Sequence, residues 1–336
     1  MTSITDTEAP GMNLAENYAL KVRGAKQLEG ADRRFFGLTL ASAITVLLIF
    51  AGVFIALFKG AWPALHEFGF AFFVTQKWNP VTEKFGILAP IYGTLVTSAL
   101  AMAFAVPIGI GVAIFLTEIC PRALRRSIGI AIELLAGIPS IIYGIWGLFV
   151  FAPFFQKNIQ PFLIDILHPI PFIGFLFEGP PYGIGIFTAS LILAIMILPL
   201  ISSITRDVFD TVPPMLKEAG YGLGCTTWEV IWNVVLPYTR NGVVGGAMLA
   251  LGRALGETMA VTFVIGNAHK IDPSIFHPGT TISAAIANEF AEAVGELYMS
   301  SLLAAGFFLF IITFVVLAGA QWMLASLDKA AGGSKK

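Results

Sequence analysis

Charged side chains are scarce in this chain. Asp, Glu, Lys and Arg make up 12% of its 336 residues, whereas a soluble domain carries about 25%. Hydrophobic residues account for 57% of the chain. This balance excludes an ordinary soluble domain and predicts a protein that crosses the membrane several times.

Cysteine and histidine are also scarce, and neither type is grouped. The two cysteines, Cys120 and Cys225, are read as unpaired packing residues, because the topology expected below places both on the cytoplasmic side, where thiols stay reduced. The four histidines are scattered and form no metal-binding spacing. The sequence also has no Gly-x-x-x-x-Gly-Lys-Ser/Thr loop. We therefore expect no metal or cofactor, and no ATP hydrolysis by this chain alone.

Six apolar stretches are long enough to cross a bilayer, which takes roughly 20 residues. They predict an all-α integral membrane protein with six transmembrane helices. The expected spans are residues 35–58, a helix within 85–117, and residues 127–151, 182–205, 242–267 and about 300–327.

The distribution of Lys and Arg orients these spans. With the N-terminus in the cytoplasm, the inside segments hold 14 of the 20 Lys and Arg residues and the outside loops hold 5, with Arg253 as the remaining one. Such an asymmetry is typical of cytoplasmic loops. We therefore expect a cytoplasmic N-terminal segment (1–34), a transmembrane domain (35–327) and a cytoplasmic tail (328–336).

Arg253 and Glu257 lie in an apolar run, residues 241–269, that holds no other acidic or basic side chain apart from its histidine. A charge at the bilayer centre costs about 2.5–3.5 kcal/mol on insertion scales, so it usually marks a polar interior or an ion path. Their spacing of four predicts that both side chains share one helix face. Gly or Ala recurs every four residues from Gly242 to Ala254, which predicts close packing against other helices.

Three interpretations of this pair are open: a structural ion pair, a substrate site, or a gate. Arg precedes Glu here, which is the weaker order for a brace within one helix. The planar guanidinium of Arg also suits an oxyanion, to which it donates two parallel hydrogen bonds. We therefore favour a role in a transport path, as substrate site or as gate.

Other polar positions are weaker candidates. Glu133 either lines the inner vestibule or is a locally bonded carboxylate, and Ser140 follows a proline that could break the third span and free polar groups for a path. Glu118 is expected to be solvated at the cytoplasmic end of the second span. Outside, residues 158–181 predict a partly buried surface loop broken by proline, and residues 280–298 an amphipathic surface helix.

The inside loop, about residues 206–240, has a structure of its own. A proline pair predicts the start of a short helix over residues 215–221, and Gly222 and Gly224 would end it. Thr226 and Glu229 have the spacing of a capping box, which predicts a second short helix to about residue 235 that stops before Pro237. Exposed apolar residues on both helices favour a docking surface for a cytoplasmic partner.

This loop resembles the "EAA" loop of ABC importer permeases. The resemblance rests on Glu218, Ala219, Gly220, Gly224, Leu236 and Pro237, with Gly220 standing where the family pattern has a second Ala. In that family the loop docks into a separate ATPase, so the resemblance implies the same role for these residues.

Longer segments resemble the permease subunits of the bacterial high-affinity phosphate importer. They include residues 90–98 and 224–232, residues 132–144 (IELLAGIPSIIYG) and residues 252–263 (GRALGETMAVTF). The resemblance implies a type I (MetI-like) ABC permease in the bacterial inner membrane. It also implies a second permease subunit, an ATPase dimer on the cytoplasmic face and a periplasmic phosphate-binding protein, and it places Arg253 and Glu257 in transport.

We therefore interpret the chain as a non-enzymatic permease subunit of an ATP-driven phosphate importer. One alternative is a permease for another tetrahedral oxyanion, such as sulfate or molybdate. A second, less favoured, is an intramembrane enzyme or stand-alone carrier, because the chain has no metal or nucleophile constellation and does have the loop pattern.

The expected orientation can be tested at Cys225, which lies in the inside loop. We predict that a membrane-impermeant thiol reagent labels Cys225 in inverted vesicles and leaves it unlabelled in intact cells, because the basic residues place this loop in the cytoplasm. Labelling in intact cells would show that the orientation is reversed.

Overall fold

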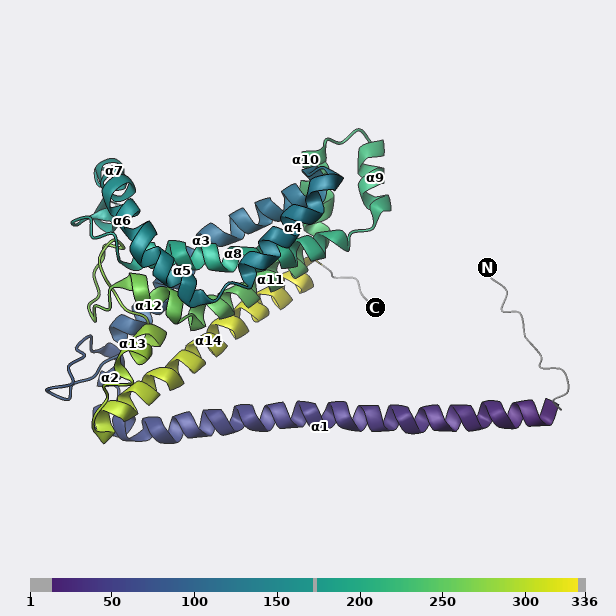
Figure 1. The fold of residues 1–336 in the computed structure, drawn as a ribbon, viewed down its shortest axis with the longest axis horizontal. Helices are drawn as coiled ribbons and strands as arrows, with labels where there is room; N and C mark the ends of the chain where they lie inside the picture. The colour runs from purple at the N-terminus through teal and green to yellow at the C-terminus, as the bar shows by residue number, and fades with distance from the viewer. Residues whose placement is uncertain (1–13, 172–173, 332–336) are drawn as a thin grey trace. The chain divides into compact units, whose positions relative to one another are not determined.

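The computed structural model describes residues 14–171 and 174–331 (Figure 1). Within these ranges the regular secondary structure consists of helices, joined by loops and turns, and of an isolated bridge between Asn79 and Lys84. It divides into two compact units, one ending at Ala56 and the other starting at Leu57. Residues 1–13 of the expected N-terminal segment and 332–336 of the expected tail lie outside the description.

The first unit consists of the larger part of α1 (Leu14–Phe68). From Asp32 to Phe68 this helix is long and apolar enough to span a membrane, so it contains the first expected span. Its large apolar side chains, from Phe35 to Ile55, are exposed. Apolar side chains that no other part of the unit covers suit a helix that faces lipid.

The second unit holds the other candidate spans. They are α3 with η1 (Leu88–Ile114, Phe115–Ile119), the run of α5, η2, α6, η3 and α7 (Ser140–Trp146, Gly147–Phe151, Ala152–Phe154, Phe155–Ile159, Gln160–Leu167), α8 (Ile186–Asp210) and α14 (Glu296–Ala331). A bent pair completes the set: α10, η5 and α11 (Thr227–Val230, Ile231–Val235, Leu236–Gly256) followed by α12 (Met259–Ile265). Counted as one span, this pair brings the candidates in the described chain to six, as the sequence predicts.

Shorter elements connect these spans. They are α2 (Ala71–Val74), α4 (Arg122–Ala136), η4 (Gly174–Phe177), α9 (Pro214–Gly222) and α13 (Ile282–Glu289). The loop at about residues 206–240 thus contains the two predicted short helices, with the capping box between Thr226 and Glu229 in place.

Helix α8 forms the centre of the second unit, and most of its residues are buried. Small residues set how closely its neighbours approach. On α3, a Cβ at Gly109 would come within 2.7 Å of the Ile201 side chain. On α11, Gly242 and Gly246 lie against Val208 and Ile204 of α8. The predicted packing of the Gly/Ala ladder is therefore confirmed.

The end of α1 docks on α14 around Pro63, within the second unit. Proline donates no hydrogen bond and disturbs the helical ladder around it. The Ala64 N–H donates to Ser300 Oγ at 2.9 Å, and this hydroxyl donates to the Gly60 carbonyl at 2.8 Å. The side chain of Ser300 thus bridges Ala64 and Gly60 of α1.

The third span differs from the prediction of residues 127–151. The helix is broken at Gly137–Pro139, and the membrane-length run is Ser140–Leu167. The prolines within residues 158–181 were expected to break the helix. Pro161, and Pro153 before it, are instead accommodated, because each lies just after a π-helical turn, η2 or η3.

Two further expectations were wrong. The second loop helix does not stop before Pro237, because the π-helical turn η5 carries it into α11 without interruption. The outer segment 280–298 is not a surface helix either. Its helix α13 is short, buries Ile282, Ser283, Ala284 and Ala285, and packs against α3, α12 and α14.

The position of Gly93 yields a stability prediction. A Cβ at buried Gly93 would overlap the Thr280 carbonyl oxygen, whereas a Cβ at Gly111, on the same helix, would meet nothing within 4 Å. We predict that Gly93→Ala destabilises the detergent-solubilised protein by about 1–3 kcal/mol. Gly111→Ala should be neutral or stabilising by up to about 1 kcal/mol. The thermal unfolding temperatures of the two variants test this prediction. Equal stability would contradict the close approach of Gly93 to the Thr280 carbonyl.

Candidate transport site

The helical path is interrupted at two places that matter here, and both interruptions have local causes. Between α4 and α5, Pro139 has φ −56° and ψ 136°, and its ring also disfavours helix at the residue before it. Between α11 and α12, Glu257 is extended at φ −68° and ψ 132°, and the two helices differ in direction by 58°. Interrupted helices within a membrane protein leave peptide groups free to line a cavity.

The helices that follow the two breaks pack directly on each other. A Cβ at Gly144 of α5 would lie 2.9 Å from the Met259 carbonyl oxygen and 3.1 Å from the Ala260 Cα, both on α12. Only glycine allows this approach of backbone to backbone. The contact therefore places the segment after Pro139 next to the segment after Glu257.

Tyr143 connects the two sides of the first break. Its side chain is buried, and its hydroxyl donates to the Leu135 carbonyl in the last turn of α4 at 2.8 Å. The guanidinium of Arg253, in the last turn of α11, interacts electrostatically with the Tyr143 phenol. The sequence analysis missed Tyr143, although its place one turn after Pro139 and Ser140 could have drawn attention to it.

Arg253 and Glu257 do not share a helix face, which corrects the prediction from their spacing. Helix α11 ends at Gly256, so the extended Glu257 turns its side chain toward α12. There its Oε1 accepts a hydrogen bond from the Ala260 N–H at 3.3 Å. Among the described residues no ion pair joins Glu257 to Arg253, and Arg253 is exposed.

The weaker candidates separate as well. Ser140 is the first residue of α5, at the break, whereas Glu133 lies on α4 and accepts a hydrogen bond from Arg206 of α8 at 2.7 Å. Glu118 is not solvated as expected: its side chain is only 8% exposed and pairs with Lys217 at 2.6 Å. Of these three, only Ser140 lies at a helix break.

The loop helix α9 presents the residues of the EAA pattern. Glu218 and Ala219 are exposed, while Gly220 is buried against Val230, where a Cβ would approach to 3.1 Å. This close packing gives a reason for glycine in place of the family's second Ala. Gly224 has φ +85°, a conformation that favours glycine, and it turns the chain toward α10.

An exposed apolar surface surrounds this loop. Trp228 and Trp232 stack with their ring centroids 5.6 Å apart and are 63% and 59% exposed. Met215, Leu216 and Tyr221, apolar residues of α9 for which exposure was expected, are exposed too. Leu236 and Pro237 line an adjoining cavity of about 520 Å³. Apolar side chains gathered in this way are typical of a protein-docking surface.

A polar cluster that the sequence analysis missed surrounds Glu289 of α13. Its carboxylate lies 2.8 Å from His269 Nε2 and accepts hydrogen bonds from Tyr298 Oη, also at 2.8 Å, and from Trp78 Nε1. Burial would raise the pKa of the Glu289 carboxyl, but these hydrogen bonds and the charge of His269 outweigh it and lower that pKa. The cluster joins side chains from four segments, of which Trp78 is far from the other three in the sequence, and no spacing pattern reveals it.

A smaller cluster centres on Asp272. His277 Nδ1 lies 2.9 Å from its carboxylate, and the Ser274 N–H donates to it at 3.0 Å. Burial would raise the pKa of Asp272, but these bonds and the charges of His277 and Lys270 lower it. The same residues, apart from Ser274, help to line a cavity of about 400 Å³ beside Tyr182.

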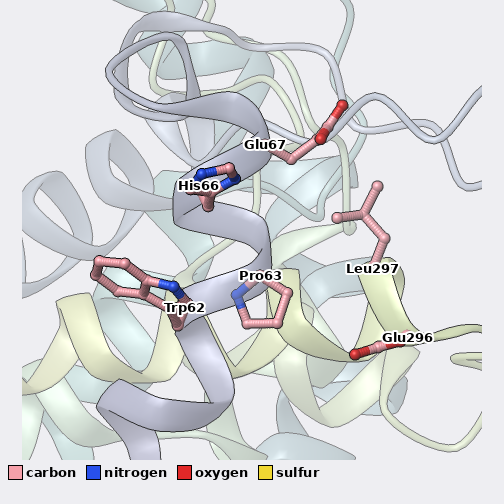
Figure 2. A pocket seen from close by; sticks show the side chains of 6 residues that line it. All are labelled: Trp62, Pro63, His66, Glu67, Glu296 and Leu297. Carbon is pink, nitrogen blue, oxygen red and sulfur yellow. The ribbon is translucent and has the colours of Figure 1, made fainter.

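Figure 2 shows another cavity, of about 450 Å³, where the end of α1 meets the start of α14. Trp62, Pro63, His66 and Glu67 line it from α1, and Glu296 and Leu297 from α14. None of the predicted pathway residues lines it. The junction of the two helix breaks is therefore the better candidate site.

Comparison with known proteins gives consistent results. Residues 105–330 match the family model described as "Binding-protein-dependent transport system inner membrane component". The chain is 66% identical over 301 residues to the phosphate transport system permease protein PstC of Mesorhizobium japonicum, covering 90% of this chain and 92% of that one. It is 57% identical over 290 residues to the PstC of Pasteurella multocida, covering 86% and 90%.

Solved ABC transporters have a similar fold. A chain of the bacterial alginate ABC transporter, in complex with an alginate-bound periplasmic protein, matches with a TM-score of 0.59 and 20% identity over 87% of this chain and 95% of that one. A chain of the inward-facing MetNI methionine transporter matches with a TM-score of 0.51 and 17% identity, over 71% and 95%. At such identities the likeness shows the fold alone, and it confirms the MetI-like architecture.

The Glu289 cluster predicts a dependence of stability on pH. A folded-state pKa below the ordinary value of 4.5 means that the carboxylate stabilises the fold above that pH, and that this stability is lost as the pH falls through the folded-state pKa. We predict that Glu289→Gln lowers the thermal unfolding temperature at neutral pH and flattens its fall in acid. Glu292→Gln, at an exposed neighbour, is the control; identical pH profiles for the two variants would contradict the role of Glu289.

Proposed function

The chain belongs to the family of binding-protein-dependent transport system inner membrane components, among the PstC permeases, and from this premise we propose that it carries inorganic phosphate as one permease subunit of an ATP-driven importer. It is a multi-pass inner-membrane protein and not an enzyme, because in this family the ATPase is a separate subunit. The observation that carries the proposal is the packing of α5 on α12, the two helices that follow the helix breaks, close to the end of α11 that carries Arg253.

We assign three partners by the relatedness to PstC. A PstA-like permease would complete the path, a PstB-like ATPase dimer would dock on the cytoplasmic face, and a PstS-like periplasmic protein would deliver phosphate. The proposed orientation places both termini, residues 1–34 and 328–336, in the cytoplasm. The loop at about 206–240 is the proposed docking element for the ATPase, through Glu218, Ala219, Gly220 and Gly224, with Leu236 and Pro237 at its end.

Arg253 is the residue to which we assign the phosphate contact. Its guanidinium makes no ion pair with Glu257, whose carboxylate instead caps α12. A guanidinium that is exposed in this way can offer two parallel N–H donors to adjacent phosphate oxygens. The lack of an Arg253–Glu257 pair supports a substrate or gating role over a permanent structural pair.

The broken helices supply the surroundings for this arginine. The end of α11 and the start of α5 leave peptide groups outside a regular ladder, and broken helices of this kind form substrate sites in other transporters. Ser140, the first residue of α5, would add a hydroxyl at the break between α4 and α5. Glu133 would act at a distance from the substrate, because it is paired with Arg206.

Substitution of Arg253 tests this proposal. Loss of a charged hydrogen bond costs about 1.5–3 kcal/mol, so we predict that Arg253→Gln lowers phosphate uptake roughly ten- to a hundredfold. Arg253→Lys should be impaired less, because it keeps the charge but loses the planar fork. Uptake is measured in cells that lack other phosphate carriers, with expression in the membrane checked.

The control is Arg126→Gln, at an exposed arginine of α4, which should keep native uptake. The exchange of Arg253→Glu with Glu257→Arg separates the roles, because a structural pair would be restored and a substrate site would not. Native uptake in Arg253→Gln, or full activity of the exchange, would overturn the assignment. Competition by sulfate or molybdate but not by phosphate would overturn the choice of substrate.

A further inference from the structure

Helix α9 turns only one side toward the rest of the chain. Of its nine residues, Lys217 and Gly220 are the two that are not exposed. Gly220 contacts Val230, at the start of the candidate span that runs through α10, η5 and α11. Lys217 supplies a second link, to the candidate span formed by α3 and η1.

The partner of Lys217 is Glu118, which lies 99 positions earlier in the chain. The Lys217 Nζ and Glu118 Oε1 are 2.6 Å apart, and the two side chains are 20% and 8% exposed. Glu118 belongs to η1, the turn that ends the α3 span just before Pro121 and α4. The pair thus joins the loop helix to the corner between α3 and α4.

We propose that the Lys217–Glu118 ion pair is a coupling strut, which passes displacements of α9 to the α3–α4 corner. The inference rests on the proposed function, in which the ATPase moves the loop that contains α9. Lys217 and Glu118 are then positioning residues: neither contacts the substrate, and both act through the helices that they join.

Burial makes this pair suited to such a role. An exposed ion pair, such as Arg125–Asp210 with side chains 37% and 55% exposed, resists displacement little, since water replaces either partner. Separating a buried pair leaves a carboxylate without compensation, which is strongly unfavourable. When α9 moves, Glu118 and the end of α3 are therefore held to Lys217.

The strut has a route to the candidate site. Helix α9 follows α8 after three residues, 211–213, so its motion also reaches α8 through the chain. Helix α3 packs on α8 at Gly109 and Ile201, and α8 packs on α11 at Ile204 and Gly246. Helix α11 carries Arg253 in its last turn. A joint movement of α3 and α8 would therefore be a movement against the helix that carries this residue.

The test uses the complete purified transporter in proteoliposomes, with phosphate-loaded binding protein outside. We expect Glu118→Gln and Lys217→Met to retain the ATPase during purification and to keep basal ATP hydrolysis. Stimulation of hydrolysis by the loaded binding protein, and phosphate uptake, should each fall about tenfold, a size typical of a lost coupling between sites. The exchange Glu118→Lys with Lys217→Glu should restore both, because it rebuilds the pair.

Asp210→Asn is the matched control. It breaks the exposed ion pair between Asp210, the last residue of α8, and Arg125 of α4, and it should leave the stimulation of hydrolysis unchanged. Native stimulation in Glu118→Gln or in Lys217→Met would overturn the strut. An exchange variant as defective as the single variants, with the ATPase still bound, would overturn it too. A native complex that phosphate-loaded binding protein fails to stimulate would instead overturn the proposed function, and this is seen before any variant is made.

Discussion

The contact between α5 and α12 at Gly144 is the constraint on which the candidate site depends. Each of these helices follows a break, and a side chain at Gly144 would push the two backbones apart. Because the contact is made by main-chain atoms of Met259 and Ala260, it fixes the direction in which each chain leaves its break. Tyr143 then closes the first break onto α4 through its hydrogen bond to the Leu135 carbonyl.

The π-helical turns explain much of what proline does in this fold. Each of the four such turns in the described ranges is followed, two positions after its last residue, by a proline: Pro121, Pro153, Pro161 and Pro237. In each case the residue before the proline bonds to a carbonyl five positions earlier. A wide turn relieves the clash of the proline ring with the preceding carbonyls, so three of these helices continue.

The sequence was sufficient for the number of spans and for the two loop helices with their capping box, because these follow from composition and from neighbouring residues. It was insufficient where one local rule competes with another. The spacing of Arg253 and Glu257 predicts a shared face only if the helix continues, and it ends at Gly256. The prolines within residues 158–181 looked like helix breaks, because nothing in the sequence showed the π-helical turns. The pairing of Lys217 with Glu118, and of His269 with Glu289, joins residues that no periodicity relates.

The hydroxyl of Ser300 has a consequence for the order in which the protein is made. It supplies the hydrogen bonds of Ala64 N–H and of the Gly60 carbonyl in α1. The ribosome adds residue 300 long after residue 64, so the end of the first helix cannot reach its final bonding until the last span has been synthesised. Until then Ala64 and Gly60 lack this shared side-chain partner. The junction between the first and the last span is thus completed only after the last span has been made.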